Sequence, residues 1–111
     1  HAVAFNEDIS GWNVGNVTTM QGMFDGTQSF DYSLENWDIG QVQNMNNMLS
    51  YSQMSSSNYS TTLIGWSQQQ NISQEITLGA HGLTYCGEAV DARAYLMDEY
   101  DWSFINDEKC N

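Results

Sequence analysis

Residues 5–29, FNEDISGWNVGNVTTMQGMFDGTQS, and residues 30–54, FDYSLENWDIGQVQNMNNMLSYSQM, are two copies of one 25-residue unit. The identical pairs at this spacing are Phe5/Phe30, Trp12/Trp37, Gly15/Gly40, Val17/Val42, Met20/Met45, Met23/Met48 and Gln28/Gln53. Ile9/Leu34, Val14/Ile39 and Phe24/Leu49 exchange apolar side chains of similar size. The matches fall on the apolar skeleton of the unit, which indicates a repeat architecture.

The repeat predicts a short solenoid, because one coil cannot bury its own apolar edge whereas stacked coils can. We expect equivalent side chains to form a buried core ladder of Phe5, Phe30, Trp12, Trp37, Trp66, Met20, Met45, Met23 and Met48. The apolar–polar alternation at 12–14 and 37–39 favours one short strand per coil, paired in parallel about 4.8 Å apart. The apolar spacing over 17–24 is closer to helical and predicts a helical turn or a tight bend.

A degenerate third coil is predicted over 55–75. Residues 50–62 are rich in serine, which favours a loop, and the apolar signature returns at Leu63–Trp66. Beyond it, we expect a strand over 76–78, a helix over 88–100 with one apolar face, and a closing strand over 102–105. The predicted fold class is thus an α/β repeat, with solenoid coils over 1–75 and a C-terminal strand–helix–strand cap over 76–111.

The charge balance excludes several partners. The chain carries 14 acidic and two basic residues, a formal net charge of −12. Nucleic-acid binding depends on lysine and arginine, and an anionic membrane surface would repel this chain. No apolar run approaches the roughly 20 residues of a membrane span. The chain begins with His1, so we expect a processed or excised product from which a signal peptide could have been lost.

Cys86 and Cys110 are the two cysteines, and they bracket the predicted terminal helix. A disulfide between them is expected in an oxidising compartment, with two free thiols as the alternative. Closing this loop would stabilise the fold by roughly 3 kcal/mol in the chain-entropy model. A metal pair is disfavoured, because no further Cys or His lies at ligand spacing.

The segments AFNEDISGWNVGNVTTMQGMF and SFDYSLENWDIGQVQNMNNML closely resemble the repeat of BspA-like, Mycoplasma-lipoprotein-type surface proteins. The tail from Leu63 resembles the C-terminal end of such arrays. The resemblance implies a leucine-rich-repeat-like solenoid, export to the cell surface, and roles in adhesion or interaction. It carries no catalytic motif. The second coil departs from the pattern at Tyr32, Ser33 and Leu49, which alters surface and packing detail only.

Other candidate sites lie on the predicted surface. Three sequons begin at Asn16, Asn58 and Asn71, and Asn58 in the serine-rich segment is the preferred position for N-glycosylation. Tyr32, Tyr51 and Tyr59 break the repeat and are candidates for an exposed contact surface.

Features that could carry catalysis or bind a metal ion are weak. His81 has no recognisable nucleophile partner in the sequence, so a catalytic triad is disfavoured. The acidic residues Asp98, Glu99, Asp101, Asp107 and Glu108 could in principle attract calcium. They follow no calcium-loop pattern, and a solvated acidic face is the better interpretation. We expect no enzyme activity, cofactor or metal.

Two functions remain as hypotheses. The first is an extracellular interaction or adhesion module that binds a protein or a glycan through its neutral polar surface. The second is a structural subunit that stacks head to tail into an extracellular filament, because an uncovered coil edge invites another copy. A polysaccharide hydrolase is a weaker third, supported only by surplus carboxylates and aromatic residues.

Overall fold

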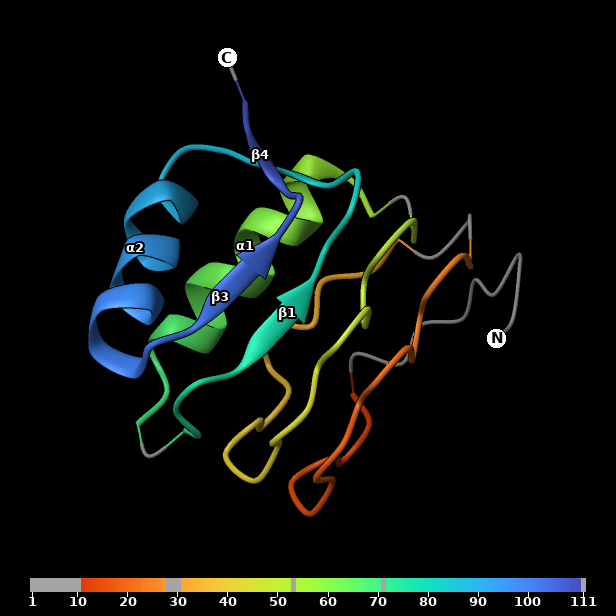
Figure 1. The fold of residues 1–111 in the computed structure, drawn as a ribbon, viewed down its shortest axis with the longest axis vertical. Helices are drawn as coiled ribbons and strands as arrows, with labels where there is room; N and C mark the ends of the chain where they lie inside the picture. Colours follow the sequence, from red (N-terminus) through yellow and green to blue (C-terminus); the bar gives the residue numbers. More distant parts are fainter. Residues whose placement is uncertain (1–10, 28–30, 53, 71, 111) are drawn as a thin grey trace.

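Four segments distant in sequence lie side by side and are joined by parallel backbone hydrogen bonds (Figure 1). The computed structural model describes residues 11–27, 31–52, 54–70 and 72–110. Its helices and strands are α1 (Ser56–Ser67), β1 (Thr77–Gly79), β2 (Thr84–Tyr85), α2 (Ala89–Tyr100), β3 (Ser103–Ile105) and β4 (Glu108–Lys109). The two helices contact each other and lie on the side of the molecule away from residues 11–27.

The hydrogen-bond ladder crosses from residues 18–26 to 43–51, then to 76–82, and then to 103–106. In the first step Met20 N–H donates to the Asn44 carbonyl (2.8 Å) and Gly26 N–H to Ser50 (2.9 Å). The second step repeats the pattern, with Tyr51 N–H donating to the His81 carbonyl (3.0 Å). In the third, β1 pairs with β3 in parallel, with Leu78 opposite Phe104. The two repeat units and the C-terminal strands therefore share one ladder.

We call each of these four hydrogen-bonded segments a layer. Each layer ends at a residue in the left-handed backbone region. These residues are Gly26 (φ 71°), Tyr51 (φ 59°), Gly82 (φ 84°) and Asn106 (φ 61°). Glycine adopts this conformation without steric cost, and asparagine tolerates it better than most residues. Tyr51 is the exception among the four, although it occupies the position equivalent to Gly26, 25 residues earlier in the sequence.

The predicted positions of the strands within the repeats are wrong. Residues 12–14 and 37–39 form no strand, and the inter-coil pairing lies in the segment predicted as a helical turn or bend. In the third unit, residues 56–67 are helical rather than extended, so this unit offers no strand that could pair with residues 37–39. Ser55 caps α1 by accepting a hydrogen bond from Asn58 N–H (3.1 Å), so the loop predicted over 50–62 is helical from Ser56 onward.

Side chains of this helical unit replace strand pairing with residues 34–39. Leu34 N–H donates to Thr62 Oγ1 (2.9 Å), and Trp66 Nε1 donates to the Leu34 carbonyl (2.9 Å). The close approach requires Gly65, because a Cβ there would lie 2.6 Å from the Glu35 carbonyl oxygen. α1 therefore lies directly against the second repeat.

Most, but not all, of the described side chains that the repeat predicts to be buried lie in the core. Trp37, Trp66, Met20, Met45 and Met48 are buried. Trp12 is 55% exposed and Met23 is 37% exposed, so their assignment to the core is wrong. Phe24 of the preceding layer packs on Trp37 at 6.2 Å between ring centroids, and Gln69 contacts its carbonyl from the other side. Trp12 lies at the start of the first described segment, where its side chain is exposed. Phe5 and Phe30 lie outside the described residues.

In the C-terminal part, the expected helix and two strands are confirmed at α2, β1 and β3, each within one residue of the predicted bounds. Two further strands, β2 and β4, were not predicted; they pair in parallel, with Thr84 opposite Glu108. The expected disulfide joins Cys86, which follows β2, to Cys110, which follows β4, with 5.3 Å between the Cα atoms. The solenoid and the role of this region as a cap stay predictions.

Candidate functional site: a polar cleft and an aromatic corner

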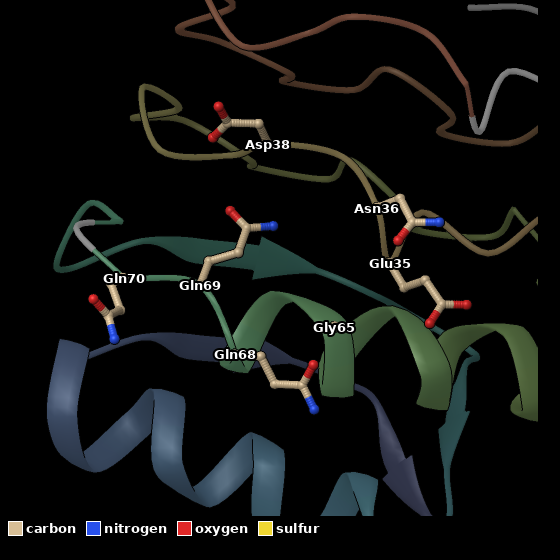
Figure 2. A pocket seen from close by; sticks show the side chains of 7 residues that line it. All are labelled: Glu35, Asn36, Asp38, Gly65, Gln68, Gln69 and Gln70. Carbon is tan, nitrogen blue, oxygen red and sulfur yellow. The ribbon is translucent and has the colours of Figure 1, made fainter.

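A cleft of about 520 Å³ opens between the second repeat and the end of α1 (Figure 2). It is lined by Glu35, Asn36, Asp38, Gly65, Gln68, Gln69 and Gln70. Apart from the glycine, every lining side chain ends in an amide or a carboxylate. These groups offer several hydrogen-bond donors and more acceptors, together with two negative charges.

The backbone and one glutamine give the cleft its shape. Gly65 lets the helix approach Glu35, and the Gln69 side chain spans the gap beyond it. Ile39 N–H donates to Gln69 Oε1 (3.1 Å), while Gln69 Nε2 donates to the Trp37 carbonyl (2.6 Å). Gln69 is thereby fixed as a wall, whereas Asn36 and Gln70 are exposed at the rim.

The cleft is suited to hydrogen bonding. Its lining includes no serine, cysteine, lysine or histidine, and its ionisable groups are the carboxylates of Glu35 and Asp38. Amide and carboxylate groups match the hydroxyl groups of a neutral ligand or the N–H groups of a cationic one. The net charge of −12 disfavours an anionic occupant.

A second hollow of about 380 Å³ lies at the corner of the ladder and is lined by Tyr51, Met54, His81 and Gly82. The Tyr51 ring stacks on the His81 ring, with 5.2 Å between centroids and 23° between planes. Ser50 Oγ and His81 Nδ1 are hydrogen-bonded at 3.0 Å. Ser50 is 1% exposed, so this serine is not accessible to a substrate.

Sequence reasoning missed the pairing of His81 with Ser50 and Tyr51, which lie 31 and 30 residues earlier in the chain. No local motif connects these residues. The pairing of residues 43–51 with residues 76–82 brings them together.

The three tyrosines predicted as a contact surface separate in the structure. Tyr51 is exposed and Tyr32 is half-buried against the core. Tyr59 is fully buried, so its assignment to a contact surface is wrong. It lies on the inward face of α1, where its hydroxyl donates to Asp107 Oδ2 (2.7 Å). Burial, and secondarily the negative charge of Asp107, raise the pKa of Tyr59 well above its usual value.

The sequons have different environments. Asn16 is exposed. Asn58 lies in the first turn of α1, and its Nδ2 donates to the Asp31 carbonyl (3.1 Å) and to Asp31 Oδ1 (2.8 Å). Its amide nitrogen, the atom that a glycan would modify, is thus already engaged, which makes Asn16 the more accessible of the two. Asn71 lies outside the described residues, and glycosylation at all three positions stays a prediction.

Asp107 does not belong to an exposed acidic face. Its side chain is fully buried and accepts bonds from Arg93 Nη2 (2.9 Å) and Nε (3.0 Å). The Arg93 guanidinium also lies over the rings of Tyr85 (4.6 Å) and Phe104 (4.8 Å). Within the described ranges, no three His, Cys, Asp or Glu side chains are placed to hold a metal ion. No helix in those ranges is long and apolar enough to cross a membrane.

The structure thus defines a class: a small protein of parallel-paired 25-residue units, continued by disulfide-linked C-terminal strands. Over residues 1–77 the chain matches, and it belongs to, the family described as "Mycoplasma protein of unknown function, DUF285". Neither curated proteins nor solved structures include a significant match to it.

Proposed function

We propose that the chain is a non-catalytic interaction or adhesion module of a cell surface, built as a leucine-rich-repeat-like solenoid of the BspA-like kind. The single observation that carries the proposal is the polar cleft. The amide and carboxylate groups that line this hollow can donate and accept hydrogen bonds to a ligand.

The environment of the protein supports the same role. The Cys86–Cys110 disulfide is typical of proteins in oxidising compartments, which favours an extracellular location. The family match is consistent with a Mycoplasma or BspA-like surface protein. A strongly acidic surface disfavours anionic partners, so the ligand is a glycan or an extracellular protein that presents neutral or basic groups.

The test is a binding screen of the disulfide-bonded chain against immobilised neutral glycans and extracellular proteins. The double variant Asn36→Ala/Gln70→Ala removes two amides from the rim of the cleft. Because each hydrogen bond contributes about 0.5–1.5 kcal/mol, we expect affinity for the ligand found to fall roughly tenfold. Gln41→Ala, an exposed amide outside the cleft, is the matched control. Unchanged binding by the double variant, or no ligand at all, contradicts the proposal.

A second candidate function, a self-assembling filament subunit, is favoured by the exposed side chains of the first described layer. Trp12 and Met23 are exposed, although their repeat equivalents Trp37 and Met48 are fully buried. A second copy stacked on this face would give them the same covering, and a head-to-tail contact that does not close on itself makes a fibre. β3, the last strand of the described ladder, exposes Ile105 and would provide the complementary face.

Light scattering and electron microscopy at rising protein concentration test this candidate. We expect the wild-type chain to form elongated assemblies and Trp12→Ser/Met23→Ser to stay monomeric. Tyr95→Ser/Met97→Ser, which removes two exposed apolar side chains from α2, is the control and should still assemble. Monomeric wild-type protein at high concentration would exclude the filament.

A further inference from the structure

The corner residue of the second layer combines a strained backbone with an exposed aromatic ring. Gly26, Gly82 and Asn106 occupy the equivalent corners, and these residue types adopt φ > 0 at little cost. A tyrosine at φ 59° is disfavoured by its Cβ. The sequence nevertheless places Tyr51 there, so something other than the turn must favour the aromatic side chain.

Core packing does not supply that reason, because Tyr51 remains 60% exposed. Its described ring contact is with His81, which is itself only half-buried. Strained residues that contribute little to folding concentrate at binding sites, where the side chain serves a ligand. The outlier at Tyr51 therefore points to recognition at this corner.

His81 is held in a defined orientation beneath the tyrosine. Its Nδ1 is hydrogen-bonded to Ser50 Oγ at 3.0 Å, and Ser50 is buried. This is the only side-chain hydrogen bond of His81 among the described residues, and it engages Nδ1 rather than Nε2. An imidazole nitrogen can donate or accept a hydrogen bond according to its tautomer, so it can pair with a hydroxyl group in either sense.

The hollow beside these rings has the size and lining of a small-ligand subsite. Its volume of about 380 Å³ falls at the lower end of the range of about 300–1,000 Å³ for ligand pockets. Gly82 lines the hollow without a side chain to fill it. Met54 adds an apolar wall.

We propose that Tyr51 and His81 form a stacking subsite for a neutral pyranose. One face of a pyranose presents C–H groups that pack on an aromatic ring, and its rim presents hydroxyl groups that reach His81 Nε2. The net charge of −12 repels sulfated or uronic sugars and selects for an uncharged ring. The inference rests on the proposed interaction role, for which it names a ligand class at a site distinct from the polar cleft.

The test uses saturation-transfer NMR and calorimetry with oligosaccharides of glucose, galactose, mannose and N-acetylglucosamine, and with a uronic-acid oligosaccharide as the charged comparison. We expect at least one neutral sugar to bind and the uronic sugar to bind at least tenfold more weakly. Tyr51→Gly should abolish binding while raising Tm, because glycine relieves the strained backbone. His81→Phe keeps a ring in place and should weaken binding about tenfold.

Tyr95→Ser removes an exposed tyrosine of α2 and should leave sugar binding unchanged. Sugar binding that survives Tyr51→Gly in a folded, disulfide-bonded variant overturns the subsite. So does a wild-type chain that binds none of the neutral sugars, or that binds the uronic sugar equally well. Failure here leaves the proposed function standing if a ligand found in the wider screen still depends on Asn36 and Gln70; loss of both responses overturns both proposals.

Discussion

The two halves of the molecule are stabilised in different ways, although one ladder runs through both. In residues 11–52 the contacts are backbone hydrogen bonds between layers and an apolar interior around Trp37, Met45 and Met48. In residues 72–110 the ladder is reinforced by the disulfide and by a buried ion pair.

The two halves differ in stabilisation because only residues 11–52 belong to the two 25-residue repeats. A coil of the repeat covers its neighbour with the same side chains in each layer, so apolar burial suffices once a layer is covered on both sides. The C-terminal strands have only two or three residues each, and most of these residues are not fully buried. The disulfide and the Arg93–Asp107 ion pair add covalent and polar links to this half.

The largest effect expected is from removing the central side chain of the repeats. Trp37→Ala should lower the free energy of unfolding by about 3–5 kcal/mol, because it leaves a cavity between two layers. Trp12→Ala, at the identical position one repeat earlier, should change it by less than about 0.5 kcal/mol, since the side chain is exposed. Denaturant unfolding of both variants measures the contrast. Equal losses would mean that the two repeats have the same environment.

Removing the Cys86–Cys110 disulfide tests how residues 72–110 are stabilised. Cys86→Ser/Cys110→Ser should cost roughly 3 kcal/mol, because the disulfide closes a loop over a sequence separation of 24 residues. Hydrogen exchange should show faster opening of β2 and β4 than of residues 18–26 and 43–51. If the repeats lose protection to the same extent, the two halves unfold as one cooperative unit and the comparison fails.

The ion pair is the polar counterpart of the disulfide. Arg93→Met keeps the apolar length of the side chain but leaves the buried Asp107 carboxylate without its cation. The free energy of unfolding should fall by about 2–3 kcal/mol. This is less than the loss of about 3–5 kcal/mol typical of a fully buried pair, because part of Arg93 is exposed. Arg93→Met/Asp107→Leu should recover part of the loss, and calorimetric Tm values report both changes. A single variant as stable as the wild type would show that the pair contributes nothing.

Much of the C-terminal half was predictable, because α2, β1 and β3 follow local periodicity. The helical face of 88–100 and the apolar runs flanking it do not depend on distant residues. The repeat was equally evident, but its strand positions were not. Alternation at 12–14 and 37–39 favours strands there. In the structure the second repeat lies instead against α1, whose Thr62 and Trp66 side chains bond the Leu34 backbone.

The candidate sites were less predictable than the fold. Tyr51 could be identified as a residue that breaks the repeat, but its left-handed backbone and its contact with His81 depend on the register of the third layer. Tyr59 looked equivalent in sequence, yet the helical phase of α1 directs it to Asp107. The polar cleft depends on Gly65 allowing two segments about 30 residues apart to meet.

The smallest effect on the free energy of unfolding is expected at alkaline pH, where Tyr59 titrates. Burial, then the carboxylate of Asp107, raise the folded-state pKa of Tyr59 above its unfolded value of about 10. The unfolded chain therefore releases this proton first, so the stabilising contribution is fully present below about pH 10 and is lost as pH rises further. Arg93 keeps its charge throughout this range.

Denaturant unfolding at about pH 8 and about pH 11 should thus show a loss of stability in the wild type that is smaller in Tyr59→Phe. At neutral pH the same variant should cost about 1 kcal/mol, the value of one hydrogen bond. Tyr95→Phe, which removes an exposed tyrosine from α2, should retain the full alkaline loss. Hydrogen exchange should place the alkaline opening at α1 and β4, because Asp107 links them, and leave residues 18–26 protected. An identical pH profile in Tyr59→Phe and the wild type would show that this buried hydroxyl does not titrate on unfolding.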